Sequence, residues 1–151
     1  MTFKKKTYRM SSEGLSDLID FAIKIINESV IGSNLQFLYD SLTDEFKSSI
    51  TISELGRRLA EMEENHGVIT KIGDSTQPTP NPISPGFWTF DISLFIKQTE
   101  WLAHFSMNTE HKINDFNFSR RPFFIPAEYF NPHKVISTKI NDLPEIYYVK
   151  P

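Results

Sequence analysis

The sequence predicts an α+β fold, with three N-terminal helices packed on a curved antiparallel sheet. Between residues 11 and 67, apolar residues recur at the spacing of one helix face. After Gly67 the pattern changes to the alternation of half-buried strands, and the separators are short enough for hairpins. Helices and strands in separate blocks indicate an α+β layer arrangement rather than alternating βαβ units.

The first two predicted helices begin at serine residues. Ser11 and Ser12 can cap a first helix, whose apolar stripe lies within residues 15–26. A glycine then interrupts the pattern, and residues 33–36 (SNLQ) form a capping-box motif for a short second helix. In this motif the hydroxyl of Ser33 is expected to accept a hydrogen bond from the backbone of the first turn.

The last helical segments begin at threonine residues. Thr43 or Asp44 can start a further helical turn, and residues 51–54 (TISE) form a second capping box that opens the third helix. Gly67 is suited to end that helix, because glycine readily adopts the backbone conformations found after a helix C-terminus.

The second half of the chain is expected to form the sheet. The segment at 75–86 contains four prolines in twelve residues and is expected to be an irregular surface loop. Residues 135–140 and 146–149 are expected to form a last, weak hairpin. The remaining strands are predicted at residues 67–74, 87–97, 100–108 and 112–118.

The hairpin turns fix which side chains share a face. A two-residue turn at Gln98 and Thr99 is expected to pair Lys97 with Glu100, and a second turn is expected at residues 110–111. Alternation then places a wholly apolar set of side chains on one face of the sheet. The set is Trp88, Phe90, Ile92, Leu94, Ile96, Trp101, Ala103, Phe105, Met107, Phe116 and Phe118.

The opposite, outer face is expected to be mixed. Asp91 and His104 are predicted there, diagonal to one another, together with further polar residues and the apolar residues Phe87, Phe95, Leu102 and Ile113. Two interpretations follow: a solvated or subunit-facing polar surface, or an acid–base pair. Catalysis needs a concave, partly dry site, so the first interpretation is preferred.

Composition excludes several classes of function. The net charge of −3 argues against a broad nucleic-acid face, and no apolar run approaches the length of a membrane span. The chain has no cysteine, and its four histidines do not stand at metal-ligand spacing. No phosphate-loop or dinucleotide motif indicates a cofactor. With no signal peptide evident, a cytoplasmic location is expected.

The helical segment also carries a resemblance, in which the matching positions are Phe37, Tyr39, Leu42, Phe46, Leu55, Gly67 and Ile72. Residues 15–118 resemble the nuclear-transport-factor-2-like superfamily, which has a cystatin-like α+β cone. More narrowly, the segments at 21–29 and 34–74 are most similar to a bacterial domain family of unknown function that is sometimes found N-terminal to α/β-hydrolases. Residues 125–140 are similar to the link that joins those two domains.

The resemblance implies a three-part chain: a basic tail at 1–10, the superfamily-like domain at 11–118 and a proline- and aromatic-rich extension at 119–151. Enzymes of the superfamily, such as ketosteroid isomerase, place acids and bases on the inner sheet face. Here that face lacks such a residue, with Asn114 as the one polar candidate. No hydrolase nucleophile motif is present.

The first functional hypothesis is therefore a non-catalytic domain that binds a small apolar ligand or a protein partner and forms a homodimer through the outer sheet face. The alternative is a small isomerase, dehydratase or cyclase that uses Tyr39, Asp91 and His104. The candidate ligand-pocket residues are Tyr39, Trp88, Phe90, Trp101, Phe105, Asn114 and Phe116.

Overall fold

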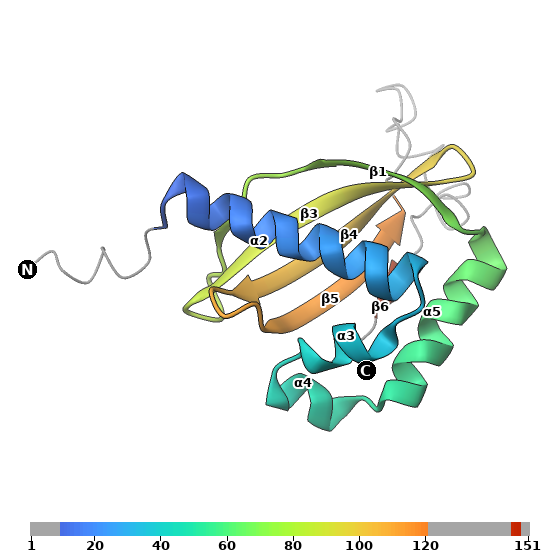
Figure 1. The fold of residues 1–151 in the computed structure, drawn as a ribbon, viewed down its shortest axis with the longest axis horizontal. Helices are drawn as coiled ribbons and strands as arrows, with labels where there is room; N and C mark the ends of the chain where they lie inside the picture. Colours follow the sequence, from blue (N-terminus) through green and yellow to red (C-terminus); the bar gives the residue numbers. More distant parts are fainter. Residues whose placement is uncertain (1–9, 121–145, 149–151) are drawn as a thin grey trace, which may run out of the picture.

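The computed structural model describes residues 10–120 and the backbone of residues 146–148. Helices come first and an antiparallel sheet follows, which confirms the predicted α+β class. Figure 1 shows the helices on one side of the sheet, with α2 lying across it. The helical elements are α2 (Ser12–Ile25), the π-helix η1 (Ile26–Ile31), α3 (Leu35–Asp40), α4 (Asp44–Ser49) and α5 (Ile52–His66). The strands are β1 (Ile69–Ser75), β2 (Thr79–Pro80), β3 (Phe87–Ile96), β4 (Thr99–Asn108), β5 (Ile113–Arg120) and β6 (Ile146–Tyr148).

Three of the predicted helix starts are confirmed by side-chain caps. The hydroxyl of Ser11 accepts a hydrogen bond from Gly14 N at 3.1 Å, and that of Thr43 accepts one from Phe46 N at 3.2 Å. Thr51 caps α5 in the same way, through Glu54 N. Each cap satisfies a backbone N–H that has no partner within the first turn of its helix.

The capping box predicted at Ser33 is wrong. Ser33 has a φ of 64°, in the left-handed region, and Asn34 occupies the cap position of α3 without a side-chain hydrogen bond. The reason is that helical structure continues past α2 as the π-helix η1. Gly32 N and Asn34 N bond back to carbonyls of that helix, and the hydroxyl of Ser29 donates to Asn34 O at 2.7 Å. These bonds hold the segment between η1 and α3 in place without a side-chain cap.

The sheet has the strand order β1-β3-β4-β5-β6, with β2 beside β3. The segment at 75–86 was expected to be wholly irregular, but β2 pairs Thr79 with Thr89 and Pro80 with Trp88. A proline is tolerated in this place because β2 is a short edge strand. β6 pairs with β5, whereas the hairpin partner predicted for it at 135–140 lies outside the described residues.

The predicted turn between β3 and β4 is off by one residue. Lys97 and Gln98 occupy it, with φ values of 49° and 70°, so that Ile96 pairs with Thr99 and Asp91 lies directly opposite His104. Each β3 residue therefore pairs with a β4 residue that lies two positions earlier in the chain than the predicted partner. A shift of two keeps each side chain on its predicted face, because side chains alternate with a period of two.

The second hairpin has the predicted register up to a β-bulge. Phe105 pairs with Phe116 as expected, but the register shifts next to the turn, where Met107 pairs with Ile113 and Asn114 is the extra residue. The bulge turns Ile113 inward, and its side chain is fully buried. The prediction that Ile113 lies on the outer face is therefore wrong.

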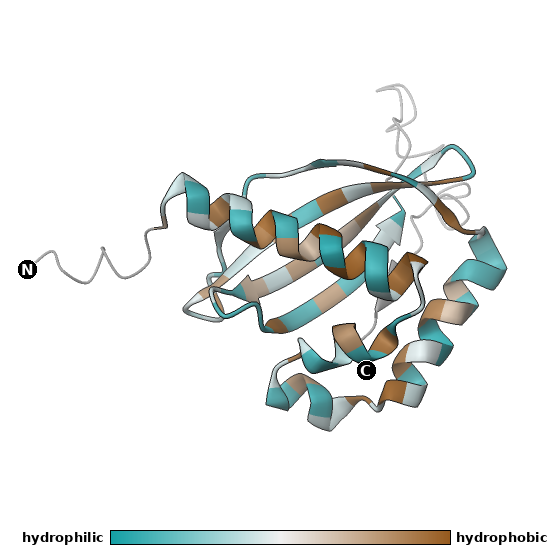
Figure 2. Ribbon diagram, viewed as in Figure 1, coloured by the Kyte–Doolittle hydropathy of each residue, from teal (hydrophilic) through white to brown (hydrophobic). Residues whose placement is uncertain are grey.

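The predicted apolar face of the sheet forms the core with the helices. Its eleven side chains are all buried, and helices contribute residues such as Leu18, Ile25 and Leu55 to the same cluster. Figure 2 shows hydrophobic and hydrophilic residues interleaved along α2 and the strands, as expected of elements that bury one side. The ring of Phe105 lies 5.7 Å from that of Phe90 and 5.0 Å from that of Phe116, between centroids.

Two phenylalanines on opposite faces of the sheet test this arrangement. We expect Phe105→Ala to lower the free energy of unfolding by about 3–5 kcal/mol, because it opens a cavity among buried rings. Phe95→Ala removes the same atoms from the half-buried outer face and is expected to cost roughly 1–2 kcal/mol. Urea denaturation measures both values, and equal losses would contradict the assignment of the two faces.

Candidate functional site

The outer face of the sheet carries a row of polar side chains across its central strands. Asp91 on β3 pairs with His104 on β4, which in turn pairs with Asn117 on β5. His104 Nδ1 lies 2.8 Å from Asp91 Oδ1, and because a carboxylate only accepts hydrogen bonds, Nδ1 is the donor. His104 Nε2 lies 3.9 Å from Asp115 Oδ2. The three charged or titratable side chains are each about one-third exposed, at 30% for His104, 33% for Asp91 and 34% for Asp115.

This surrounding raises the pKa of His104 above its ordinary value. The hydrogen bond to Asp91 is the main cause; burial opposes it, and the charges of Asp91 and Asp115 add to it. The imidazole therefore holds its proton more tightly than a free histidine does. A tightly held proton favours an ion-paired structural role over that of a general base, which must be free to accept a proton near neutral pH.

The proline-rich segment between β1 and β3 supports this face. Thr76 exchanges two hydrogen bonds with the backbone of Asp91, at 2.9 and 2.8 Å. Asn81 Nδ2 donates to the hydroxyl of Ser106 at 3.0 Å, and Ser106 is fully buried although it points to the outer face. The segment therefore covers part of a surface that the sequence predicted to be open.

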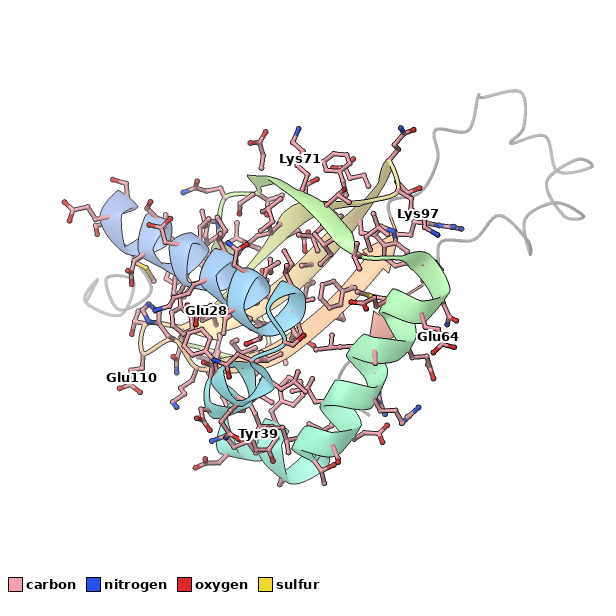
Figure 3. All side chains as sticks on the ribbon, turned by 45° about the vertical axis from the view of Figure 1, so that its right-hand side comes forward. Glu28, Tyr39, Glu64, Lys71, Lys97 and Glu110 are labelled. Carbon is pink, nitrogen blue, oxygen red and sulfur yellow. The ribbon has the colours of Figure 1, made fainter. Side chains whose placement is uncertain are left out.

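Tyr39 does not join Asp91 and His104 in one site. Its hydroxyl lies within hydrogen-bond distance of the backbone carbonyls of Lys47 and Ile50, at 3.4 and 3.2 Å, and ties α3 to the segment around α4. Figure 3 shows Tyr39 among the short helices. Asp91 and His104 lie on the sheet face that points away from the helices, so the three residues of the alternative acid–base site do not converge.

Five of the candidate pocket residues are packed in the core. Their exposed fractions are at most 8%, and the ring of His66 on α5 lies 4.8 Å from that of Trp101, between centroids. Side chains packed in this way fill the space between helices and sheet. The five residues are Trp88, Phe90, Trp101, Phe105 and Phe116.

The seventh candidate, Asn114, lines a cavity of about 460 Å³ at the edge of the helix–sheet interface. This volume lies within the range of roughly 300–1,000 Å³ that is typical of small-molecule sites. We call it the α4 cavity, because most of its wall comes from that helix and its cap. Its lining residues are Thr43, Glu45, Phe46, Ser49, Ser84, Phe87 and Asn114.

A short parallel bridge holds α4 against the start of β5. Thr43 N donates to Ile113 O at 2.9 Å, and Ile113 N donates to Ser41 O at 2.8 Å. The bulge then makes Asn114 the unpaired residue beside this anchor, which brings its carboxamide to the wall of the cavity. The sequence signals Thr43 through its capping role, but it gives no sign of the bulge or of Ser84 and Phe87 as neighbours.

The carboxamide of Asn114 has an unmet hydrogen-bonding requirement. Its Oδ1 is buried and has no hydrogen-bond partner. Leaving such an acceptor unpaired costs about 1–3 kcal/mol. Because χ2 of asparagine is a soft torsion, the amide can rotate at small cost. A ligand in the cavity could then supply the missing partner.

Comparisons with known protein families, with curated proteins and with solved structures give no match. The resemblance to nuclear-transport-factor-2-like domains therefore stays a prediction. Among residues 10–120, no group of three or more histidine, aspartate or glutamate side chains is arranged to hold a metal ion. In that same part of the chain, every helix is too short or too polar to cross a bilayer.

The pairing of His104 with Asp91 predicts a pH-dependent stability. The pKa of His104 is higher in the folded protein than in the unfolded chain, where it is about 6.5. Below pH 6.5 the pair therefore contributes its full stabilisation to the fold. This contribution is lost as the pH rises through the pKa of the folded protein. We expect Asp91→Asn to lower the pKa of His104, and to destabilise the protein more at about pH 5 than at about pH 9.

NMR titration of the His104 ring and urea denaturation at the two pH values measure these effects. Asp115→Asn is the matched control, and its effect is expected to be smaller because Asp115 lies 3.9 Å from the ring and acts only through its charge. An unchanged pKa in Asp91→Asn would contradict the assignment.

Proposed function

We propose that this protein is a non-catalytic domain that binds a small ligand in the α4 cavity. The observation that carries the proposal is that a cavity of about 460 Å³ is lined by Asn114, a residue whose carboxamide oxygen is buried and has no hydrogen-bond partner. Ligand sites commonly combine apolar walls with a few polar groups that orient the ligand. Here Phe46 and Phe87 supply the apolar walls, and Asn114 and three hydroxyl groups supply the polar ones.

The arrangement favours binding over catalysis. The cavity wall contains one titratable side chain, Glu45, which is exposed and is not paired with a histidine or a second acid in the wall. General acid–base catalysis needs a group positioned on the reacting atom and tuned by its surroundings. His104, whose pKa is raised by its hydrogen bond to Asp91, lies with that residue on the other face of the sheet.

Two neighbouring serines on α4 test the proposal. Ser48 and Ser49 are both exposed, and each hydroxyl donates to a carbonyl three residues earlier, at 2.7 and 2.8 Å. Only Ser49 lines the cavity. We expect Ser49→Trp to fill the cavity and to weaken at least tenfold the binding of any small compound that a fragment screen by protein NMR identifies there.

Ser48→Trp carries the same substitution one position away and is expected to bind like the wild type. Thermal unfolding of both variants establishes that they are folded. Equal binding by the two variants, or a screen that perturbs no backbone amide around the cavity, would contradict the proposal.

A homodimer contact through the outer sheet face is a second proposed role. It is favoured by the half-buried Phe95 and Leu102, which lie among the polar residues of that face. Interfaces of modest size combine a few apolar residues with a polar rim. The two residues come from neighbouring strands and lie diagonal to one another, since Phe95 pairs with Glu100 and Leu102 with Ser93.

We expect Leu102→Glu to shift a dimer towards the monomer in size-exclusion chromatography with light scattering. Ile31→Glu is the control, since Ile31 is also an exposed apolar residue but belongs to η1 in the helical layer. A wild-type protein that stays monomeric at high concentration would contradict this role.

A further inference from the structure

Three polar groups in the wall of the α4 cavity offer hydrogen-bond acceptors to a ligand. Glu45 presents a carboxylate, which only accepts. The hydroxyl of Ser49 donates its proton to Phe46 O, so only its lone pairs remain for a ligand. The one orphaned group, Asn114 Oδ1, is also an acceptor. Donors are also present: the hydroxyl of Thr43 accepts from Phe46 N and keeps its proton, and the hydroxyl of Ser84 and the Nδ2 of Asn114 have protons of their own.

The charge in the wall of the cavity is negative. Among residues 10–120, Glu45 is the one charged residue in its wall, and no lysine, arginine or histidine of that range lines it. Lys47, on the same helix, lies over the ring of Tyr39 at 5.8 Å from its centroid. Lys112, next to the β5 anchor, donates to Asp40 O at 3.0 Å. These two lysines therefore contact other groups, and within the described part of the chain an anionic ligand would meet the carboxylate of Glu45 without a cation in the wall.

The apolar part of the cavity complements a cation. Phe46 and Phe87 contribute aromatic side chains to the wall, and the face of an aromatic ring attracts a positive charge placed over it. A primary ammonium supplies three N–H donors and one positive charge. It could satisfy the carboxylate of Glu45 and, after rotation of the amide, the oxygen of Asn114, while an attached apolar group contacts the two rings.

We propose that the α4 cavity binds a small organic cation, a primary ammonium carried on an aromatic or similarly compact apolar group. This inference rests on the proposed ligand-binding function and names the chemical class of its ligand. Glu45 is the positioning charge, Phe46 and Phe87 hold the apolar group, and Asn114 accepts a hydrogen bond from the ammonium.

The test compares three probes of the same size and different charge on the full chain. Protein NMR titrations measure the binding of benzylammonium, benzyl alcohol and benzoate at low ionic strength. We expect benzylammonium to bind roughly two- to fivefold more tightly than benzyl alcohol, as is typical of a partly exposed ion pair, and benzoate to bind most weakly. Added salt is expected to reduce the preference for the cation.

Two variants of the first turn of α4 identify the source of the preference. Glu45→Gln is expected to remove the advantage of benzylammonium over benzyl alcohol. Asp44→Asn removes an exposed carboxylate from the same turn, but Asp44 does not line the cavity, so this variant is expected to keep the advantage. Both variants lose one negative charge near the helix N-terminus, so their effects on helix stability are matched.

Three outcomes overturn the inference in distinguishable ways. Equal binding of the cation and the alcohol refutes the ligand class but leaves the proposed binding function intact. A preference for the cation that persists in Glu45→Gln refutes the role of Glu45. Failure of all three probes refutes the ligand class, and the fragment screen with Ser49→Trp then decides the binding function separately.

Discussion

The burial of one continuous aromatic and aliphatic sheet face against the helices is the constraint on which the rest of the structure depends. The side chains of β3, β4 and β5 alternate along most of their length, so most of the apolar members lie together on the inner face and most of the polar members lie on the outer face. Phe90, Phe105 and Phe116 form a row of rings at the centre of that face. Removing such a face from water supplies the main driving force for folding of this kind of domain.

The burial of this sheet face also decides where polar side chains can lie. Asp91 and His104 sit in the middle of the sheet but on its outer face, where they pair with one another rather than with a guest between helices and sheet. The candidate cavity lies beside a place in the sheet where the alternation fails. That place is the β5 bulge, which turns Ile113 inward and leaves Asn114 unpaired beside α4. A local irregularity of the sheet thereby generates the candidate binding site.

The hairpin between β3 and β4 illustrates how packing outweighs local turn preference. Neither the predicted turn residues nor the observed pair, Lys97 and Gln98, has the glycine or asparagine that such turns favour. The turn chemistry could therefore not fix the register. The observed register places Leu94 opposite Trp101 and Phe90 opposite Phe105, so large side chains meet across the strands. The predicted faces survived because the error was an even number of residues.

The amino-acid sequence by itself determined the class of the fold, three helix caps, the strands of the central sheet and the composition of its buried face. These features depend on periodicity and on residue types at single positions, which are local properties. Tertiary structure alone decided the π-helix after Ile25, the bulge at Asn114, the packing of the proline-rich segment over Ser106 and the contact of α4 with β5. Each of these joins residues far apart in the chain or balances competing hydrogen bonds, and no local pattern encodes such a balance.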